Sequence, residues 1–301
     1  MLTLTILGNN SAMPTLERHP TSQVLSNGKT DFLIDCGEGT QTQLLRYQQK
    51  INRISHIFIS HLHGDHYLGL AGLLNSMALM NRTHDLYLYA VPELFPIIDM
   101  QLNVTGGILP YQLPCVPLVK EGDLCKIDDI EVSCFKTNHR ITCYGFVFKE
   151  IKNPRKINPE AVGTYQIPFS FYEALQKGAD YLLPDGTYLP NSDLTEPHKN
   201  IHSYAFAADT LYDESMISFI KNVDCLYHES TYLNDKLDLA TERYHSTAKQ
   251  AATLALKAEV GQLIIGHFSS RYKSLEPFLE EAISVFPNTH LALEGSTFKI
   301  I

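Results

Sequence analysis

Three histidines and one aspartate fall within six consecutive residues, His61-Leu62-His63-Gly64-Asp65-His66. Imidazole and carboxylate groups bind zinc and neighbouring transition metals, and the lack of cysteine in the run argues against a closed structural zinc site. One short loop cannot easily aim four ligands at a single tetrahedral ion, so the run predicts two adjacent ions. His61 and His63 would bind one ion, and Asp65 and His66 would bind the other.

Three more candidate ligands lie far away in the sequence. Each follows an apolar stretch that predicts a β-strand; they are His139, Asp209 and His267, after residues 132–136, 203–207 and 262–265. The C-terminal ends of strands are where α/β sheets place their sites, so these side chains are predicted to join the histidine run. An aspartate between the two groups, such as Asp209, could bridge both ions.

Two further residues carry groups that can move a proton. Glu229 follows the apolar stretch 223–227, and His245 precedes a helix predicted over residues 246–257, with Ser246 as its expected N-cap. A carboxylate and an imidazole near the metals would form a pair able to donate a proton to a leaving oxygen. The sequence does not show whether the two side chains touch.

The elements that must position these residues alternate between strand and helix in both halves of the chain. Apolar stretches predict strands at residues 2–7, 22–25, 31–36, 54–59, 86–90, 203–207, 223–227 and 262–265. Helices are predicted at residues 40–49, 68–80, 93–102, 246–257 and 275–285, and several strands in succession within 115–148. This order predicts an α/β fold in which two sheets pack face to face with helices outside.

Residues 151–198 break the alternation, being rich in Pro, Asn, Asp and Tyr. We interpret them as an arm at about residues 150–200, inserted into a single domain of residues 1–301. The arm begins with a basic cluster that includes Lys152, Arg155 and Lys156. These side chains are candidate substrate contacts, and the alternative is a surface loop with ordinary solvated charges.

Composition limits the classes of function. The chain has 301 residues, 44% of them hydrophobic, and can bury a sizeable core, but its formal net charge of −9 provides no global positive field for a nucleic acid. RNA binding would have to come from local basic segments or from metal ions. The six scattered cysteines form no C-x-x-C pair, as is typical of free thiols in a reducing compartment. With no signal peptide and no membrane-spanning stretch visible, a cytoplasmic protein without a membrane partner is expected.

Six local motifs, spread over almost the whole chain, resemble the ribonuclease Z family of the metallo-β-lactamase superfamily. They are Asp35-Cys36-Gly37-Glu38-Gly39-Thr40-Gln41, the run at 61–66, His139, Asp209-Thr210, His228-Glu229-Ser230-Thr231 with His245-Ser246-Thr247, and Gly266-His267-Phe268. The histidine run alone defines only the superfamily. The first motif and the fragments around Glu229 and His245 are far more specific to ribonuclease Z.

The resemblance implies a metallo-β-lactamase αβ/βα sandwich of two mixed sheets with an exosite-like arm. It implies a zinc-dependent endoribonuclease that removes the 3′ trailer from tRNA precursors and leaves a 3′-hydroxyl, acting as a homodimer. Two Zn²⁺ would be bound per chain, with Mn²⁺ or Fe²⁺ also fitting the ligands. His61, His63, His139 and Asp209 would hold one ion, and Asp65, His66, Asp209 and His267 the other. Asp65 would be the general base, and Glu229 with His245 the proton-donating pair.

The sequence departs from this family in two places. The family's Pro-x-Lys-x-Arg-Asn segment is Pro14-Thr15-Leu16-Glu17-Arg18-His19 here, which loses the lysine and the asparagine but keeps Arg18 as a candidate RNA contact. The arm carries Pro168-Phe169-Ser170-Phe171-Tyr172 where the family has a Gly-Pro-rich tip. Such an aromatic tip could stack on bases or riboses, or pack on the protein itself.

Other functions fit parts of the sequence. A metallo-phosphodiesterase acting on a small or cyclic phosphodiester would need no basic arm and would suit the charge of −9. A non-catalytic RNA-binding scaffold could keep the fold but would have no use for Asp65 or Glu229. Hydrolysis of a β-lactam or a thioester by the same metal core is a further alternative, because one fold hosts several activities.

Overall fold

The computed structural model describes residues 2–104, 106, 109–151, 154–196 and 201–301. Lys152, one of the predicted substrate contacts, lies outside the described residues. The chain divides into two compact units. Unit 1 contains Met1–Cys125, Val132–Phe148 and His202–Ile301, and unit 2 contains Lys126–Glu131 and Lys149–Ile201.

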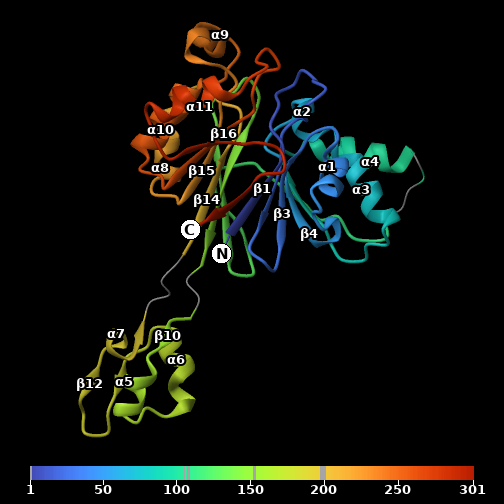
Figure 1. Ribbon diagram of the computed structural model, residues 1–301. Coiled ribbons are helices and arrows are strands. Elements are labelled where there is room, and N and C mark those ends of the chain that lie inside the picture. The colour runs from blue at the N-terminus through green and yellow to red at the C-terminus, as the bar shows by residue number, and fades with distance from the viewer. Residues whose placement is uncertain (1, 105, 107–108, 152–153, 197–200) are drawn as a thin grey trace. The chain divides into compact units, whose positions relative to one another are not determined.

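Two seven-stranded sheets form the centre of unit 1 (Figure 1). The first has the order β18 (Thr297–Ile300), β1 (Leu2–Gly8), β2 (Ser22–Ser26), β3 (Asp31–Cys36), β4 (Ile54–Phe58), β5 (Tyr87–Ala90) and β6 (Cys115–Pro117). The second has the order β17 (Thr289–Leu291), β16 (Gln262–Gly266), β15 (Cys225–Glu229), β14 (Ser203–Ala207), β9 (Tyr144–Glu150), β8 (Ile130–Lys136) and β7 (Gly122–Ile127).

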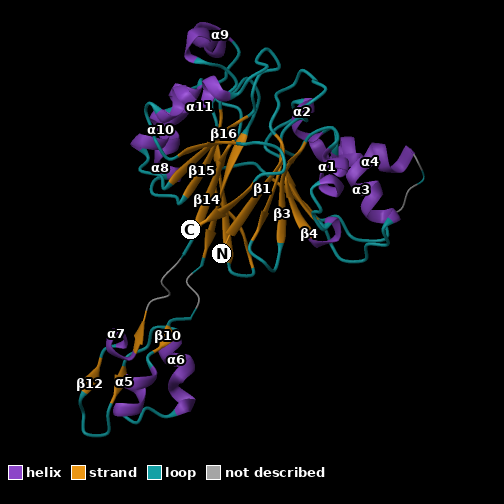
Figure 2. Ribbon diagram, viewed as in Figure 1, coloured by secondary structure: helices purple, strands orange, loops and turns teal. Residues whose placement is uncertain are grey.

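Helices lie on the outer side of each sheet (Figure 2). Beside the first sheet are α1 (Thr40–Arg46), α3 (Leu70–Leu79) and α4 (Leu94–Val104), and beside the second are α8 (Ile217–Ile220), α10 (Ala248–Lys257) and α11 (Glu276–Ile283). Two short helices belong to the site region: α2 (Gly64–Tyr67) contains the last three residues of the histidine run, and α9 (Leu237–Glu242) lies between Glu229 and His245. No helix in the described part of the chain has both the length and the apolarity needed to cross a membrane.

Three layers of apolar side chains hold unit 1 together. Between the sheets the core is aromatic: Phe58 of β4 meets Phe146 and Phe148 of β9 at ring-centroid distances of 5.3 and 5.2 Å. Outside each sheet a second layer packs under the helices. Strands β3, β14 and β15 are buried along their whole length, and each has an apolar stretch of at least three residues in its sequence.

The predicted strands and helices agree with the observed ones to within a few residues, and the predicted two-sheet sandwich is what the chain forms. The sequence did not reveal β17 and β18, and β18 pairs with β1 in antiparallel register. The expected N-cap of α10 was wrong by one residue. Thr247 caps the helix in a capping box with Gln250, while the Ser246 hydroxyl donates to the carbonyl of Thr210.

Parallel pairing determines where the site lies. In the first sheet β3, β4 and β5 are parallel, and in the second β14, β15, β16 and β17 are parallel. The C-terminal ends of parallel neighbours lie along one edge of their sheet. The histidine run follows β4 of the first sheet, and Asp209 and His267 follow β14 and β16 of the second. Residues far apart in the sequence therefore lie together beyond the C-terminal ends of these strands.

Unit 2 has its own small core. Its elements are β10 (Lys156–Ile157), α5 (Pro159–Thr164), α6 (Tyr172–Gln176), β11 (Tyr181–Leu182), β12 (Tyr188–Leu189), α7 (Asn191–Leu194) and β13 (Thr195–Glu196). Val162, Ile167, Leu175, Leu189 and Leu194 form its buried cluster. The unit therefore has internal packing, and its main segment begins and ends near the residues predicted for the arm.

We predict that Arg82 anchors the strand that leads to the histidine run. Its side chain is 3% exposed and donates to the backbone carbonyls of Ile54, His84 and Asp85 at 2.7–2.8 Å. Arg82→Met would keep the apolar stem but leave these carbonyls without a donor, lowering the free energy of unfolding by about 2–3 kcal/mol. Urea denaturation measures this, with the exposed Arg46→Met as control; equal midpoints would show that Arg82 is dispensable.

Candidate metal centre and active site

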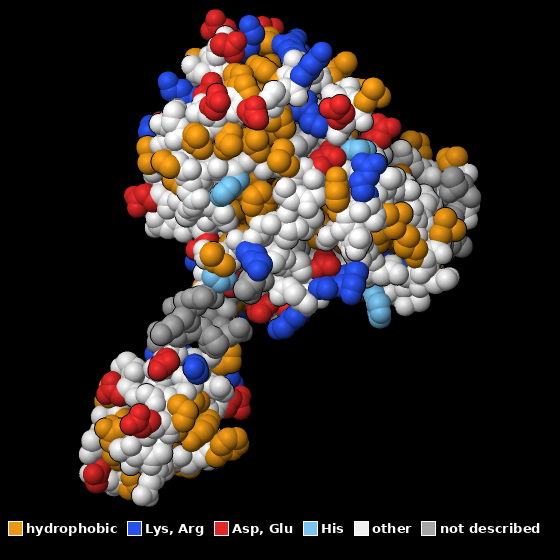
Figure 3. All heavy atoms as spheres, in the orientation of Figure 1, with side chains coloured by type: hydrophobic (Ala, Val, Ile, Leu, Met, Phe, Trp, Pro, Cys, Tyr) orange, Lys and Arg blue, Asp and Glu red, His pale blue; other side chains and the backbone are white. Residues whose placement is uncertain are grey.

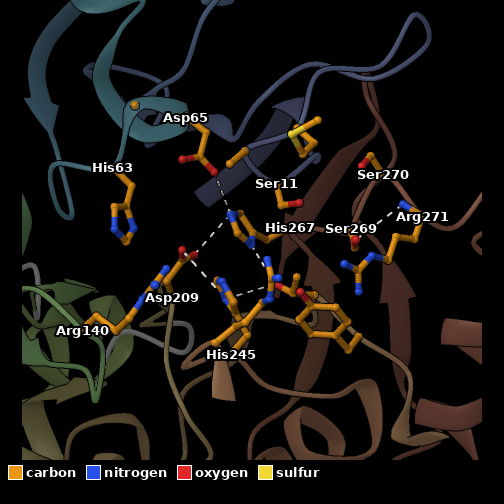
Figure 4. A pocket seen from close by; sticks show the side chains of 16 residues that line it. Ser11, His63, Asp65, Arg140, Asp209, His245, His267, Ser269, Ser270 and Arg271 are labelled. Atoms are coloured by element: carbon orange, nitrogen blue, oxygen red, sulfur yellow. Dashed lines mark hydrogen bonds and ion pairs between the residues drawn. The ribbon is translucent and has the colours of Figure 1, made fainter. Parts of the chain in front are cut away.

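A pocket of about 280 Å³ opens where the strand ends meet, entirely within unit 1. Figure 4 shows His63, Asp65, Asp209, His245 and His267 pointing into it from different elements. His63 and Asp65 come from the loop and helix after β4, and the others come from loops after β14, α9 and β16. All seven predicted metal ligands lie at or beside this pocket.

The first group of candidate ligands is His61, His63, His139 and Asp209. The Nδ1 atom of His63 lies 3.0 Å from Nε2 of His61 and 3.1 Å from Nε2 of His139. Asp209 Oδ2 lies 3.6 Å from the His61 nitrogen and 3.8 Å from the His139 nitrogen. Three imidazoles and one carboxylate oxygen therefore face one point.

The protonation of these imidazoles suits a cation. The other ring nitrogen of His139 lies 2.9 Å from the carbonyl oxygen of Tyr244, which can only accept, so Nδ1 carries the hydrogen and Nε2 has a free lone pair. Burial lowers the pKa of His61, His63 and His139, so all three are neutral near pH 7. Neutral imidazole is the form that binds a metal.

The second group contains Asp65, His66 and His267, with Asp209 beside it. Asp65 Oδ2 lies 3.2 Å from His267 Nε2 and 3.7 Å from His66 Nε2. Asp209 Oδ1 lies 3.3 Å from His267 Nε2 and 3.4 Å from His66 Nε2. Asp209 thus turns one oxygen toward each group, which is the arrangement expected of a carboxylate that could bridge two ions.

Two buried polar atoms at the second group indicate whether a cation would fit there. Among the described residues, His66 Nε2 and Asp209 Oδ1 have no hydrogen-bond partner. Burial alone would raise the pKa of Asp209, but His267 and His66 hold it well below its ordinary value, so the carboxylate is ionised. A buried anion with an open oxygen beside ring nitrogens is a donor set that suits a divalent transition-metal ion.

Glu229 and His245, which the sequence could not place together, are in direct contact. His245 Nδ1 lies 2.8 Å from Glu229 Oε1. Burial lowers the pKa of His245, but the carboxylates of Glu229 and Asp209 outweigh that effect and raise it to about 9. Burial likewise raises the pKa of Glu229, but His245 lowers it below its ordinary value. The pair is therefore an ionised carboxylate holding an imidazolium that lines the pocket.

Asp35 supports the site, although sequence reasoning gave it no individual role. Its Oδ2 lies 2.7 Å from Nδ1 of His66, and its Oδ1 accepts the backbone N–H of Ser60 at 2.8 Å. Gly37, in the same motif, lies so near the histidine run that a Cβ would be 2.4 Å from the carbonyl oxygen of Asp65. The motif around Asp35 and Gly37 thus orients one ligand and allows close packing of the loop that carries the others.

Sequence reasoning also missed three arginines in the pocket lining, Arg140, Arg243 and Arg271. The only signal for them is adjacency, since each lies within four residues of a candidate histidine. Arg18, by contrast, lines a neighbouring cavity of about 720 Å³ and donates to the carbonyls of Ser269 and Tyr272 at 3.2 Å.

Two of the predicted substrate contacts in unit 2, Arg155 and Lys156, are described by the structure, and they differ in their surroundings. The guanidinium of Arg155 donates to the hydroxyl oxygen of Thr195 at 2.6 Å and to its carbonyl at 3.2 Å. Lys156 is exposed at the start of that unit's small sheet. Their assignment as substrate contacts stays a prediction.

Comparison with known proteins agrees with this geometry. The model of the family described as anti-Pycsar protein Apyc1 matches residues 2–156, which include the histidine run and His139. Ribonuclease Z of Bacteroides thetaiotaomicron is 40% identical over 299 residues, covering 99% of this chain and 95% of that protein.

Solved structures show the same architecture over the full length. Human tRNase Z, short form, has a TM-score of 0.72 at 25% identity and covers 99% of both chains. The metallo-β-lactamase fold protein YhfI from Bacillus subtilis has a TM-score of 0.70 at 18% identity, covering 99% of this chain and 100% of its own. The fold is thus that of the metallo-β-lactamases, and the chain belongs to the ribonuclease Z family.

Proposed function

We propose that this protein is a zinc-dependent endoribonuclease that removes the 3′ trailer from tRNA precursors and leaves a 3′-hydroxyl on the tRNA. The observation that carries the proposal is the convergence of two groups of metal-ligand side chains and the Glu229–His245 pair on one pocket. The 40% sequence identity to a ribonuclease Z over 99% of this chain supports tRNA precursors as the substrate.

The ligand groups suggest two ions per chain. His61, His63, His139 and Asp209 would hold one, and Asp65, His66, Asp209 and His267 would hold the other. When bound, such ions lower the pKa of a water molecule and offset the charge that develops on the phosphate oxygens. Zinc suits this imidazole and carboxylate set, and Mn²⁺ or Fe²⁺ would also fit it.

The chain's own residues supply the remaining chemistry. Asp65 is ionised, since burial would raise its pKa but His66 lowers it, and it lines the pocket as the proposed general base. His245 points into the same pocket and carries a proton that it can donate to the departing 3′-oxygen of the RNA (Figure 4). Glu229 holds His245 by its Nδ1 and stabilises the imidazolium.

A second candidate is cleavage of a small or cyclic phosphodiester, which the net charge of −9 favours. Both functions would use the same pocket, so only the substrate separates them. Cleavage of a 3′-extended tRNA precursor should be measured beside bis-p-nitrophenyl phosphate, with and without a chelator. Metal-dependent cutting of the RNA at the trailer supports the proposal, and turnover of the small ester alone would support the second candidate. A non-catalytic scaffold would cleave neither substrate.

Asp65→Ala should abolish cleavage of the precursor while leaving its binding nearly unchanged. The side chain is buried in the pocket beside His267 and His66, and an RNA would not need it for affinity. Single-turnover cleavage and filter binding of the same precursor measure the two effects separately. Equal losses of binding and cleavage would contradict the assignment of Asp65 as general base.

Asp35→Asn should weaken binding of zinc about ten- to hundredfold, because a neutral amide holds and polarises His66 less well than a carboxylate. Competition with a chromophoric chelator measures the affinity. Asp31→Asn is the matched control: it lies in the same strand, but its partners are Ser26 and Arg53, away from the pocket. Equal affinities in the two variants would remove the proposed role of Asp35.

Unit 2 is the proposed exosite for the tRNA body. Phe169 is 84% exposed at the predicted aromatic tip, and Lys156 is an exposed cation of the same unit. Replacing both by alanine should raise KM for the precursor at least about fivefold, since stacking on a base is worth about 1–3 kcal/mol. Lys177→Ala, which removes an exposed cation paired with Glu173, is the control. An equal loss with bis-p-nitrophenyl phosphate would argue against an exosite.

The homodimer and the cytoplasmic location also stay proposals, supported by the family resemblance. Sedimentation of the purified protein at several concentrations would test the dimer.

A further inference from the structure

The metal pocket has two positively charged side chains besides the proposed ions and the proton donor, and the proposed function gives these side chains no role. Arg140 and Arg243 line it, and both are exposed. Within the described residues neither forms an ion pair or a side-chain hydrogen bond. The chain as a whole has a net charge of −9, and acidic and basic side chains are interspersed on the face seen in Figure 3. Two unpaired guanidinium groups at the pocket are therefore a local feature that calls for an anionic ligand.

Both arginines belong to the side of the pocket that holds the proton donor. Arg243 precedes His245 by two residues, and Arg140 directly follows His139, whose ring centroid lies 5.4 Å from that of His245. The two loops are joined by the bond between His139 Nδ1 and the carbonyl of Tyr244. In Figure 4, Arg140 lies on the same side of His245 and His267 as Asp209 and His63, and Arg271 lies on the opposite side.

The position of the proton donor fixes the direction of an RNA chain in the pocket. A cut that leaves a 3′-hydroxyl on the tRNA expels the 3′-oxygen of its last nucleotide, and His245 is the residue placed to protonate that oxygen. The sugar of this nucleotide must then lie against His245. The next anionic group on that side is the nucleotide's own 5′-phosphate, one phosphate before the bond that is cut.

We propose that Arg140 and Arg243 bind this preceding phosphate and so hold the last retained nucleotide against His245. The inference rests on the proposed function, because it takes the polarity of the cut from it. Arginine suits the task, since its planar fork can donate two parallel hydrogen bonds to phosphate oxygens. A single-phosphate substrate has no group for this site, so the pair would favour an RNA chain over a small ester.

The first experiment compares Arg140→Gln and Arg243→Gln with wild type on a 3′-extended tRNA precursor at several salt concentrations. Each variant should raise KM about tenfold, and each should reduce the slope of log(1/KM) against log salt by about 0.7–0.9, the value for one lost phosphate contact. Arg46→Gln, which removes an exposed arginine of α1 outside the pocket, is the matched control. Salt slopes equal to that of Arg46→Gln would overturn the proposal.

The second experiment locates the phosphate. Synthetic precursors carry one neutral methylphosphonate, either one phosphate before the scissile bond or one phosphate after it. Wild type should lose about tenfold in kcat/KM with the first substrate, and the Arg140→Gln, Arg243→Gln double variant should show no further loss with it. A loss of the same size in the double variant, or a loss confined to the second substrate, would refute the assignment. Wild type that fails to cut the unmodified precursor in the same assay would instead overturn the proposed function, and this inference with it.

Discussion

The buried carboxylate of Asp209 is the interaction on which the site depends. It is ionised, 2% exposed, and presents one oxygen to each group of histidines. Burial of such a charge costs several kcal/mol unless opposite charge lies close by. The neutral imidazoles around His61 do not supply that charge. His267, His66 and His245 supply part of it, and cations bound between the groups would add to it. The pocket is thus organised around an anion that needs positive partners, and this is why its ligand atoms can face one another so closely.

Two sheets contribute to the pocket because parallel pairing in each sends its strand ends to the same edge. Residues after β4 meet residues after β14 and β16 only once the aromatic layer around Phe58 has closed the sandwich. Local features then refine the positions. Gly37 admits the backbone of the histidine run, and Asp35 orients His66. Tertiary packing therefore brings the residues of the site together, and the local motifs set the orientation of individual side chains.

The sequence predicted which candidate ligands would lie together, because they follow apolar strands and strand ends are where such sheets place their sites. It could not place Glu229 against His245, since α9 lies between them and their contact depends on how that helix folds back. The arginines of the pocket carry no periodic signal, and a single exposed arginine on a loop is common. The basic cluster of the arm shows that the sequence also does not reveal which charged side chains are already hydrogen-bonded within the protein. Its Arg155 is bonded to Thr195, a contact that no run of charges can reveal.

The hydrogen bonds around Glu229 determine which residue of the Glu229–His245 pair carries the transferable proton. Its Oε1 accepts from His245 and from the backbone N–H groups of Thr210 and Ser246, and its Oε2 accepts from the hydroxyl and N–H of Thr231. A carboxylate whose lone pairs all accept hydrogen bonds is a weak acceptor for a further proton. The only labile hydrogen of the pair that faces solvent is then on the imidazole of His245, whose side chain is 13% exposed. A proton that His245 gives up would accordingly have to be replaced on the imidazole itself, without passing through Glu229.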